Sequence, residues 1–268
     1  MFEKFHQWIL KLCVRKRNWK VNRVENTSFK LTLKKGKEDL RDQIYTRHLT
    51  ASPLPDKYVI PSLPPVRNQG NIGSCCSHAA IGAYEIELLM QKPHKFLEGS
   101  ELYHYFNVRH YINGEGDRDE GQTIRDGCKC LDKYHMATEY ACPYDVSKFN
   151  VKPSWVSYLT SGAYKITQYE QLLDLDAIKH AVTQNIPVLF GTECFESLFK
   201  LNLVNYIYIP SGNNVGGHAL LVVGYDNQKE VFIIRNSWGS RWGNGGYFEY
   251  PYAEFEKHTF DWWVIHIK

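Results

Sequence analysis

The hydrophobic pattern of the chain changes near Ile186, and this change limits the folds that it can adopt. Before it, apolar residues recur at helical spacing over Cys75–Met90, Ile124–Tyr134 and Leu172–Asn185. After it come short apolar runs bounded by turn residues, namely PVLFG, HALLVVGYD, EVFIIRNSW and GGYFEY. Early helices and late strands predict an α+β fold in which the two kinds of element are segregated.

Size and composition are those of a globular protein with one large domain or two small lobes. The 268 residues are 43% hydrophobic and 14% aromatic, which is enough for a sizeable core. No apolar run approaches the roughly 20 residues that a membrane-spanning helix needs. The seven cysteines are an odd number without a framework spacing, and we recognise no signal peptide. We therefore expect a reducing, intracellular compartment.

Charge divides the chain into a basic head and a mildly acidic body. Residues 1–50 hold 13 Lys and Arg against 5 Asp and Glu, a net charge of +8, whereas the remainder holds 19 against 24, a net charge of −5. We predict that residues 1–53 form an extension and residues 54–268 the folded body. Within residues 2–23 an apolar helical stripe precedes a basic run, which is typical of a helix on an anionic membrane surface.

Three hypotheses therefore stay open for the extension. It is a peripheral membrane helix, a short inhibitory propeptide that lies along a substrate cleft, or a solvated arm or helix packed on the body.

Three separated motifs carry the candidate chemistry. Cys75 follows the turn QGNIGS at the start of a predicted helix, where free backbone N–H groups and the helix dipole favour a thiolate. His218 begins a predicted strand in GGHALLVVGYD. Asn236 opens NSWGSRWGNGGY, in which Trp and Gly repeat at offsets that rarely arise by chance. A Cys, a His and an Asn far apart in sequence indicate a nucleophile, its base and an orienting amide.

The chain resembles the papain family of cysteine peptidases. The resemblance rests on PPVRNQGNIGSC, GGHALLVVGYD and NSWGSRWGNGGY, while SELYHYFNVR, DEGQTIRDGCKCLDKY and FDWWVIHI resemble its microbial and viral members. It runs from about Leu54 to Ile267. It implies a helical left lobe over about 66–164, an antiparallel β-barrel-like right lobe over about 54–65 and 165–268, and an active-site cleft between them.

The resemblance also implies a role for each matching residue. Cys75 would be the nucleophile, His218 the general base and later the acid, and Asn236 would orient the imidazole ring. Gln69 would donate its amide to the oxyanion, together with the Cys75 backbone N–H. Trp238 would shield the hydrogen bond between His and Asn from water. The residues that the resemblance places around the substrate are Gly121, Trp238, Cys76 and Gly217.

Three positions depart from the family's pattern. Cys76 stands where most members have Trp, which would loosen the cleft wall. Ile72 stands where secreted members have a half-cystine, so we expect that disulfide to be missing. Gly217 stands where many members have Asp or Asn, which would change the tuning of the imidazolium–thiolate pair that we expect before substrate arrives.

A metal site fits the cysteines and histidines less well. Cys128 and Cys130 are two residues apart on a predicted helix and therefore point about 200° apart. A zinc site of Cys75, Cys76 and His78 would leave the oxyanion glutamine and the Asn-Ser-Trp motif without a role. We expect neither a metal nor a cofactor.

The sequence thus predicts a cysteine-type endopeptidase that hydrolyses peptide bonds through an acyl-enzyme. Its partners would be protein or peptide substrates and not nucleic acid; the oligomeric state is left open. Two alternatives remain: a deamidase or transferase with the same triad, and a catalytically silent binding protein. The second is opposed by the intact set of Gln69, Cys75, His218 and Asn236.

Overall fold

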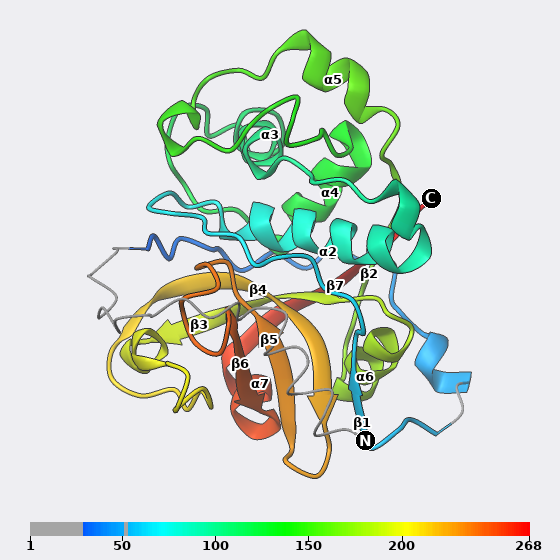
Figure 1. Cartoon of the computed structure of the whole chain (residues 1–268), viewed down its shortest axis with the longest axis vertical. Coiled ribbons are helices and arrows are strands. Elements are labelled where there is room, and N and C mark those ends of the chain that lie inside the picture. The colour runs from blue at the N-terminus through cyan, green and yellow to red at the C-terminus, as the bar shows by residue number, and fades with distance from the viewer. Residues whose placement is uncertain (1–28, 51–52) are drawn as a thin grey trace.

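The computed structural model describes residues 29–50 and 53–268, which form a helical lobe and a sheet lobe (Figure 1). The predicted membrane-surface helix of residues 2–23 lies outside the described residues. Among the residues that are described, none of the helices has both the length and the apolar character needed to cross a membrane.

The helical lobe is drawn at the top of Figure 1. Its elements are α2 (Cys75–Gln91), η2 (Pro93–Lys95), α3 (Glu101–Asn107), the π-helical turn η3 (Val108–Ile112), α4 (Ile124–Tyr134), η4 (Val146–Lys148) and α5 (Trp155–Ser161). Side chains set three of the helix starts, because Ser100, Thr123 and Ser154 each accept a hydrogen bond from the backbone N–H three residues on. Helix α4 has the predicted bounds, and α2 runs one residue further than predicted.

Within the residues that the structure describes, the sheet lobe contains seven antiparallel strands. They are β1 (Lys57–Val59), β2 (Ile166–Gln171), β3 (Val188–Phe195), β4 (Asn214–Asp226), β5 (Val231–Arg235), β6 (Tyr247–Pro251) and β7 (Thr259–Ile267). Six of them follow the order β2-β7-β3-β4-β5-β6, and β1 pairs with the end of β4 through Lys57 and Asp226. In the described part of the chain no pairing joins β2 to β6, so the barrel-like sheet that we expected is open. Its flanking elements are α6 (Leu175–Thr183), η5 (Glu196–Lys200) and α7 (Tyr252–His258).

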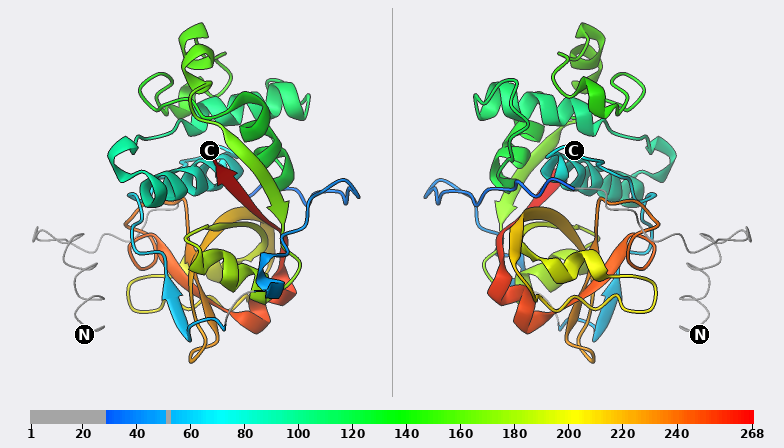
Figure 2. Two further views of the ribbon diagram at one scale, coloured as in Figure 1. Left: turned by 90° about the vertical axis from the view of Figure 1, so that its right-hand side faces the viewer. Right: turned by 90° about the vertical axis from the view of Figure 1, so that its left-hand side faces the viewer.

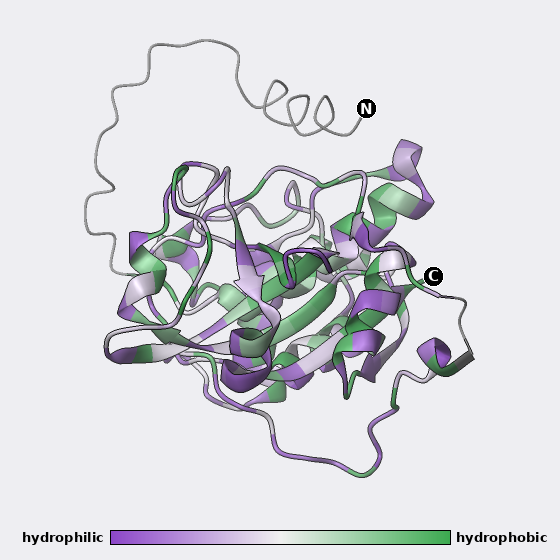
Figure 3. Ribbon diagram, turned by 90° about the horizontal axis from the view of Figure 1, so that it is seen from below, coloured by the Kyte–Doolittle hydropathy of each residue, from purple (hydrophilic) through white to green (hydrophobic). Residues whose placement is uncertain are grey.

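Helix α2 lies between the other helices of its lobe and the sheet (Figure 1). Every residue from Cys75 to Leu88 is buried. A Cβ on Gly82 would lie 3.2 Å from the Leu221 Cδ1 of β4, so helix and strand approach closely at this glycine. One continuous apolar cluster extends through both lobes, and the hydrophobic stretches accordingly gather in the middle of the molecule (Figure 3).

The described part of the extension packs on the body. The Tyr45 side chain is buried, and its hydroxyl lies 2.7 Å from the Nδ1 of His180 on α6. The short helix η1 (Arg47–Thr50) follows it. Arg125 of α4 forms ion pairs with Asp39 and Asp42 of the extension. Residues 29–50 are therefore not a solvated arm.

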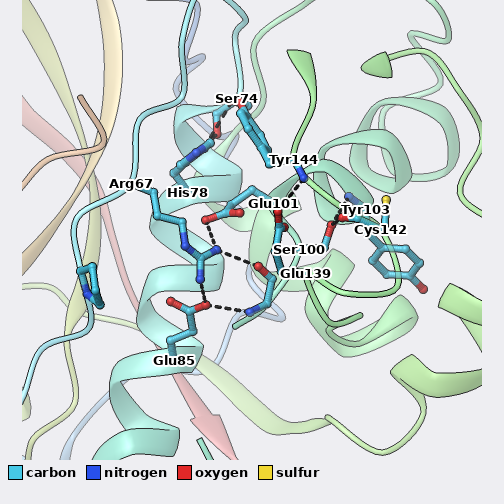
Figure 4. Close-up of polar contacts among 12 residues, drawn as sticks. Arg67, Ser74, His78, Glu85, Ser100, Glu101, Tyr103, Glu139, Cys142 and Tyr144 are labelled. Carbon is cyan, nitrogen blue, oxygen red and sulfur yellow. Dashed lines mark hydrogen bonds and ion pairs between the residues drawn. The ribbon is translucent and has the colours of Figure 1, made fainter. Parts of the chain in front are cut away.

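Arg67 connects three segments of the helical lobe through buried charge. Its guanidinium lies between the carboxylates of Glu85 on α2 and Glu101 at the start of α3 (Figure 4), and it also donates to the Gly99 carbonyl. Both glutamates are almost completely buried. Burial raises the pKa of Glu85 to about 7, although the charge of Arg67 opposes the shift. Arg67 is thus the cation that keeps these two carboxylates compatible with the core.

We predict that Arg67→Met lowers the free energy of unfolding by about 3–5 kcal/mol at pH 7, because two buried carboxylates lose their cation. Without it, their pKa values in the folded state rise further above the ordinary value of 4.5. The folded protein then binds more protons than the unfolded chain, so the loss should be smaller at pH 5 than at pH 7.

Urea unfolding at the two pH values measures this difference. Arg41→Met, which removes an 86% exposed arginine side chain paired with Asp39, is the matched control and should change stability little. An equal loss at both pH values for Arg67→Met would contradict the electrostatic explanation.

Candidate active site

Cys75 is the first residue of α2, and the turn before it is held from two sides. The Gln69 side-chain amide donates to the Ile72 carbonyl (3.1 Å), and its oxygen accepts from the Ser237 hydroxyl (2.7 Å). The Tyr144 hydroxyl donates to the Gln69 carbonyl (2.8 Å), and its oxygen lies 2.7 Å from the hydroxyl of Ser74 (Figure 4). These contacts fix the backbone that presents Cys75 and the orientation of the predicted oxyanion glutamine.

His218 and Asn236 lie together, His218 on β4 and Asn236 immediately after β5. The Nε2 of His218 is 2.8 Å from the Oδ1 of Asn236. The same Oδ1 accepts the Ser237 backbone N–H at 2.7 Å, which identifies this atom as the oxygen of the amide. His218 must then carry its proton on Nε2. Its Nδ1 is buried without a hydrogen-bond partner in the described structure, so its lone pair is available to a proton donor.

Trp238 covers the imidazole. Its ring stacks on His218 with the centroids 4.9 Å apart and 25° between the planes. The indole also packs edge-on against Trp242 at 5.0 Å. The shielding of the hydrogen bond between His218 and Asn236 stays a prediction, which rests on this bulky ring lying against the imidazole.

A six-residue piece of the extension, Phe29–Lys34, lies between the two lobes; we call it the strap, and we call the surface formed by the residues that contact it the groove. Figures 1 and 2 show this part of the chain (blue) passing between the helices and the sheet. Its backbone contacts both lobes: the Leu33 N–H donates to the Gly217 carbonyl (3.0 Å), and the Lys34 N–H donates to the Gln122 carbonyl (2.9 Å).

Glycines line the groove where the strap backbone is nearest. A Cβ on Gly121 would lie 1.3 Å from the Thr32 carbonyl oxygen, and one on Gly217 would lie 2.4 Å from the Leu33 carbonyl oxygen. Such separations are impossible for real atoms, so neither position accepts a side chain while the strap is present. Both glycines were predicted from the sequence to contact substrate, and both contact the strap.

Two apolar side chains of the strap, Phe29 and Leu33, also pack against residues of the groove. The Phe29 ring stacks on Trp238 at 4.4 Å, with 5° between the planes. Leu33 is buried, and its Cδ2 would lie 2.8 Å from a Cβ on Gly191 of β3. The strap therefore fills the groove with side chains as well as backbone.

Burial opposes charge on both reacting groups in this arrangement. It raises the pKa of Cys75 to about 11, an effect partly offset by the backbone N–H groups of Ala219, Cys76 and Cys75 itself. It lowers the pKa of His218 to about 4, although the hydrogen bond with Asn236 opposes this. A neutral thiol and a neutral imidazole are thus favoured over the predicted imidazolium–thiolate pair in this arrangement.

Cys76 faces away from the groove. Its thiol is fully buried, and it donates to the Thr123 carbonyl before α4 (3.4 Å). A Cβ on Gly127 of α4 would lie 2.6 Å from its sulfur. Consecutive residues of a helix point about 100° apart, so Cys76 packs between α2 and α4 while Cys75 faces β4. The expected effect of Cys76 on the cleft wall does not fit these contacts.

Sequence analysis missed other residues that line the groove, among them Gly73, Gly216 and Asp119. A Cβ on Gly73 would lie 2.5 Å from the Thr32 hydroxyl, and one on Gly216 would lie 2.2 Å from the Leu31 carbonyl oxygen. The paired glycines before His218 and the glycine two residues before Cys75 were visible signals. Nothing in the sequence pattern singled out Asp119.

The family model for papain family cysteine proteases matches residues 57–258. The chain belongs to the papain family. Its class is accordingly that of a cysteine protease, a thiol hydrolase.

Two relatives and one solved structure place the chain more closely. It is 32% identical over 213 residues to an uncharacterized peptidase C1-like protein of Acanthamoeba polyphaga mimivirus, with 74% of this chain and 68% of the relative covered. It is 30% identical to cathepsin S of Bos taurus, covering 68% of this chain but only 54% of the relative. The crystal structure of xylellain, a cysteine protease from Xylella fastidiosa, is similar with a TM-score of 0.79 and 32% identity over 88% of this chain and 95% of xylellain.

We predict that alkylation of Cys75 by a small thiol reagent accelerates about tenfold per pH unit from pH 6 to pH 9. The reason is that a thiol whose pKa is raised to about 11 gains thiolate steadily over this range. Peptide mapping by mass spectrometry separates Cys75 from the other thiols, and Cys75→Ala provides the blank. A rate that is already constant between pH 5 and pH 8 would show that the reagent attacks an imidazolium–thiolate pair, formed either beneath the strap or when the strap opens.

Proposed function

We propose that this chain is an endopeptidase that hydrolyses peptide bonds through Cys75, His218 and Asn236. His218 Nδ1 takes the Cys75 proton as the sulfur attacks the substrate carbonyl carbon, and the imidazolium then protonates the leaving amine. Water, deprotonated by the same imidazole, hydrolyses the thioester and regenerates the thiol. The Cys75 backbone N–H and the Gln69 amide stabilise the oxyanion formed at each attack.

The observation that carries the proposal is the pairing of His218 with Asn236. It fixes the tautomer that leaves a basic nitrogen free, and the Cys75 sulfur lies within reach of the backbone N–H of Ala219, the next residue on β4. The strap supports cleavage within chains. Its Phe29 stacks on Trp238, and beyond Lys34 the chain continues past Asp261, where the Gly36 N–H donates to that carboxylate, so the groove holds an extended polypeptide that runs on beyond it.

The two alternatives to this proposal are a related acyl-transfer enzyme and a catalytically silent binding protein. A deamidase or transferase would use the same attack with another leaving group or acceptor, and product analysis with a peptide library separates it. A silent binding protein would have no need of a fixed histidine tautomer beside a cysteine.

We predict that Cys75→Ala abolishes peptide hydrolysis, whereas Cys76→Ala retains most of it because its side chain faces α4. Steady-state hydrolysis of a quenched fluorescent peptide measures both. Thermal unfolding of the two variants checks that a loss of activity is not a loss of fold. An inactive Cys76→Ala with an active Cys75→Ala would refute the assignment of the nucleophile.

We further propose that the protein is latent while the strap is in place. The strap backbone is paired with Gly217 and Gln122 on the two sides of the groove, and the Cys75 side chain beneath it is only 1% exposed. A substrate cannot approach the sulfur until the strap leaves. This is the inhibitory hypothesis for the extension, carried by residues 29–34.

Leu33→Asp in the full chain should raise kcat/KM at least about tenfold. A carboxylate is unfavourable in the buried position beside Gly191 and Phe260, so the substitution weakens the bound state of the strap. Leu40→Asp, in the same extension but fully exposed, is the matched control and should not activate. If both variants keep the activity of the unaltered chain, the strap does not limit access.

A further inference from the structure

Both lysines of the strap bind acidic side chains on the helical-lobe side of the groove. Lys30 pairs with Asp119, and the Lys34 ammonium lies 2.6 Å from Glu115 and 3.3 Å from Glu120. We call Glu115, Asp119 and Glu120 the acidic rim. The strap is thus a bound polypeptide whose cationic groups occupy these carboxylates.

Asp119 is the member of the rim that is built into the site. Its side chain is only 10% exposed. One carboxylate oxygen, Oδ1, accepts the Gly73 backbone N–H at 2.9 Å and the Tyr105 hydroxyl. These two donors fix the carboxylate and leave the other oxygen, Oδ2, directed at the Lys30 ammonium.

The carboxylate is ionised in this position. Burial alone would raise the pKa of Asp119, but the hydrogen bonds from Lys30, Tyr105 and Gly73 together lower it below its ordinary value. When the strap leaves, Asp119 keeps the Tyr105 and Gly73 donors and loses its cation. A carboxylate held by two donors then faces a groove that polypeptide enters.

We infer that Asp119 is a specificity determinant that binds a lysine side chain of the substrate at the place now taken by Lys30. The inference rests on the proposed peptidase function. Asp119 is held by Gly73, two residues before Cys75, so the selected side chain lies close to the reacting centre. Glu115 and Glu120 add negative charge along the same side of the groove, which favours segments with more than one basic residue.

The test uses the full chain with Leu33→Asp, with and without Asp119→Asn. The amide oxygen of Asn still accepts from Gly73 and Tyr105, but its other end carries no charge. The substrates are quenched eight-residue peptides in which one lysine, moved position by position, replaces norleucine. We expect the ratio of kcat/KM for the best lysine peptide to that for its norleucine counterpart to fall about tenfold or more with Asp119→Asn, as the loss of a charge-assisted hydrogen bond implies.

Asp226→Asn is the matched control. Asp226 also pairs with a lysine, Lys57, and its side chain is 8% exposed, but it lies at the end of β4 remote from His218. The lysine-to-norleucine ratio should not change with it. An unchanged ratio with Asp119→Asn, or an equal loss for both peptides, would overturn the inference, since the second result would mark Asp119 as a purely structural support of Gly73 and Tyr105.

A binding arm separates failure of this inference from failure of the proposed function. Cys75→Ala with Leu33→Asp cannot form a thioester, and its affinity for the same peptides, labelled with a fluorophore, is measured by anisotropy. Tighter binding of the lysine peptide that disappears with Asp119→Asn supports the determinant even if no variant hydrolyses peptides. Equal affinity for the lysine and norleucine peptides overturns it, whatever the catalytic result.

Discussion

The site depends on the packing of α2 against β4. The proposed nucleophile, Cys75, belongs to the helix and its proposed base, His218, to the strand, and no local interaction brings them together. Gly82 permits the close approach, since a methyl group there would meet Leu221 at 3.2 Å. The continuous burial of α2 from Cys75 to Leu88 then holds the helix in one position. The packing of the core therefore sets the position of the α2 N-terminus relative to the His218 imidazole. The extension, the groove and the acidic rim lie around this part of the core.

Oppositely charged residues of the basic head (residues 1–50) and of the acidic body form specific ion pairs. Lys30 and Lys34 of the basic head reach the acidic rim, while Arg125 of the body reaches Asp39 and Asp42 of the head. The charge imbalance visible in the sequence is thus partly neutralised within the molecule. Several of these pairs are partly exposed, so their main effect is to choose where the extension lies and not to add much stability.

Part of the candidate site could be predicted from the sequence, because it depends on residue types in recognisable motifs. The position of His218 beside Asn236 and the bounds of α4 follow those predictions. Helix α6 was predicted from Leu172 but begins at Leu175, since the Asp174 side chain accepts from the Ala177 N–H and caps it there. Strand β7 was not predicted as a strand; Asp261, with a φ of 54°, interrupts its regular pattern.

The course of the strap could not be predicted in the same way. Its decisive contacts are backbone hydrogen bonds to Gly217 and Gln122, which leave no trace in side-chain patterning. The ion pair expected between Cys75 and His218 is disfavoured because burial raises the pKa of the thiol and lowers the pKa of the imidazole. Residue types indicated the candidate reacting groups, but the charge states of these groups follow from their burial in the folded protein.

The glycine-lined groove also limits the shape of anything that enters it as the strap does. Gly121 and Gly217 face the edges of an extended backbone from opposite sides, and they leave no room for a Cβ beside it. An extended backbone fits between these glycines, whereas an α-helix with its side chains is about 10–12 Å wide and would collide with both sides. A folded protein must therefore offer a linker, a loop or an unravelled terminus, and its local unfolding becomes part of the rate at which it is recognised.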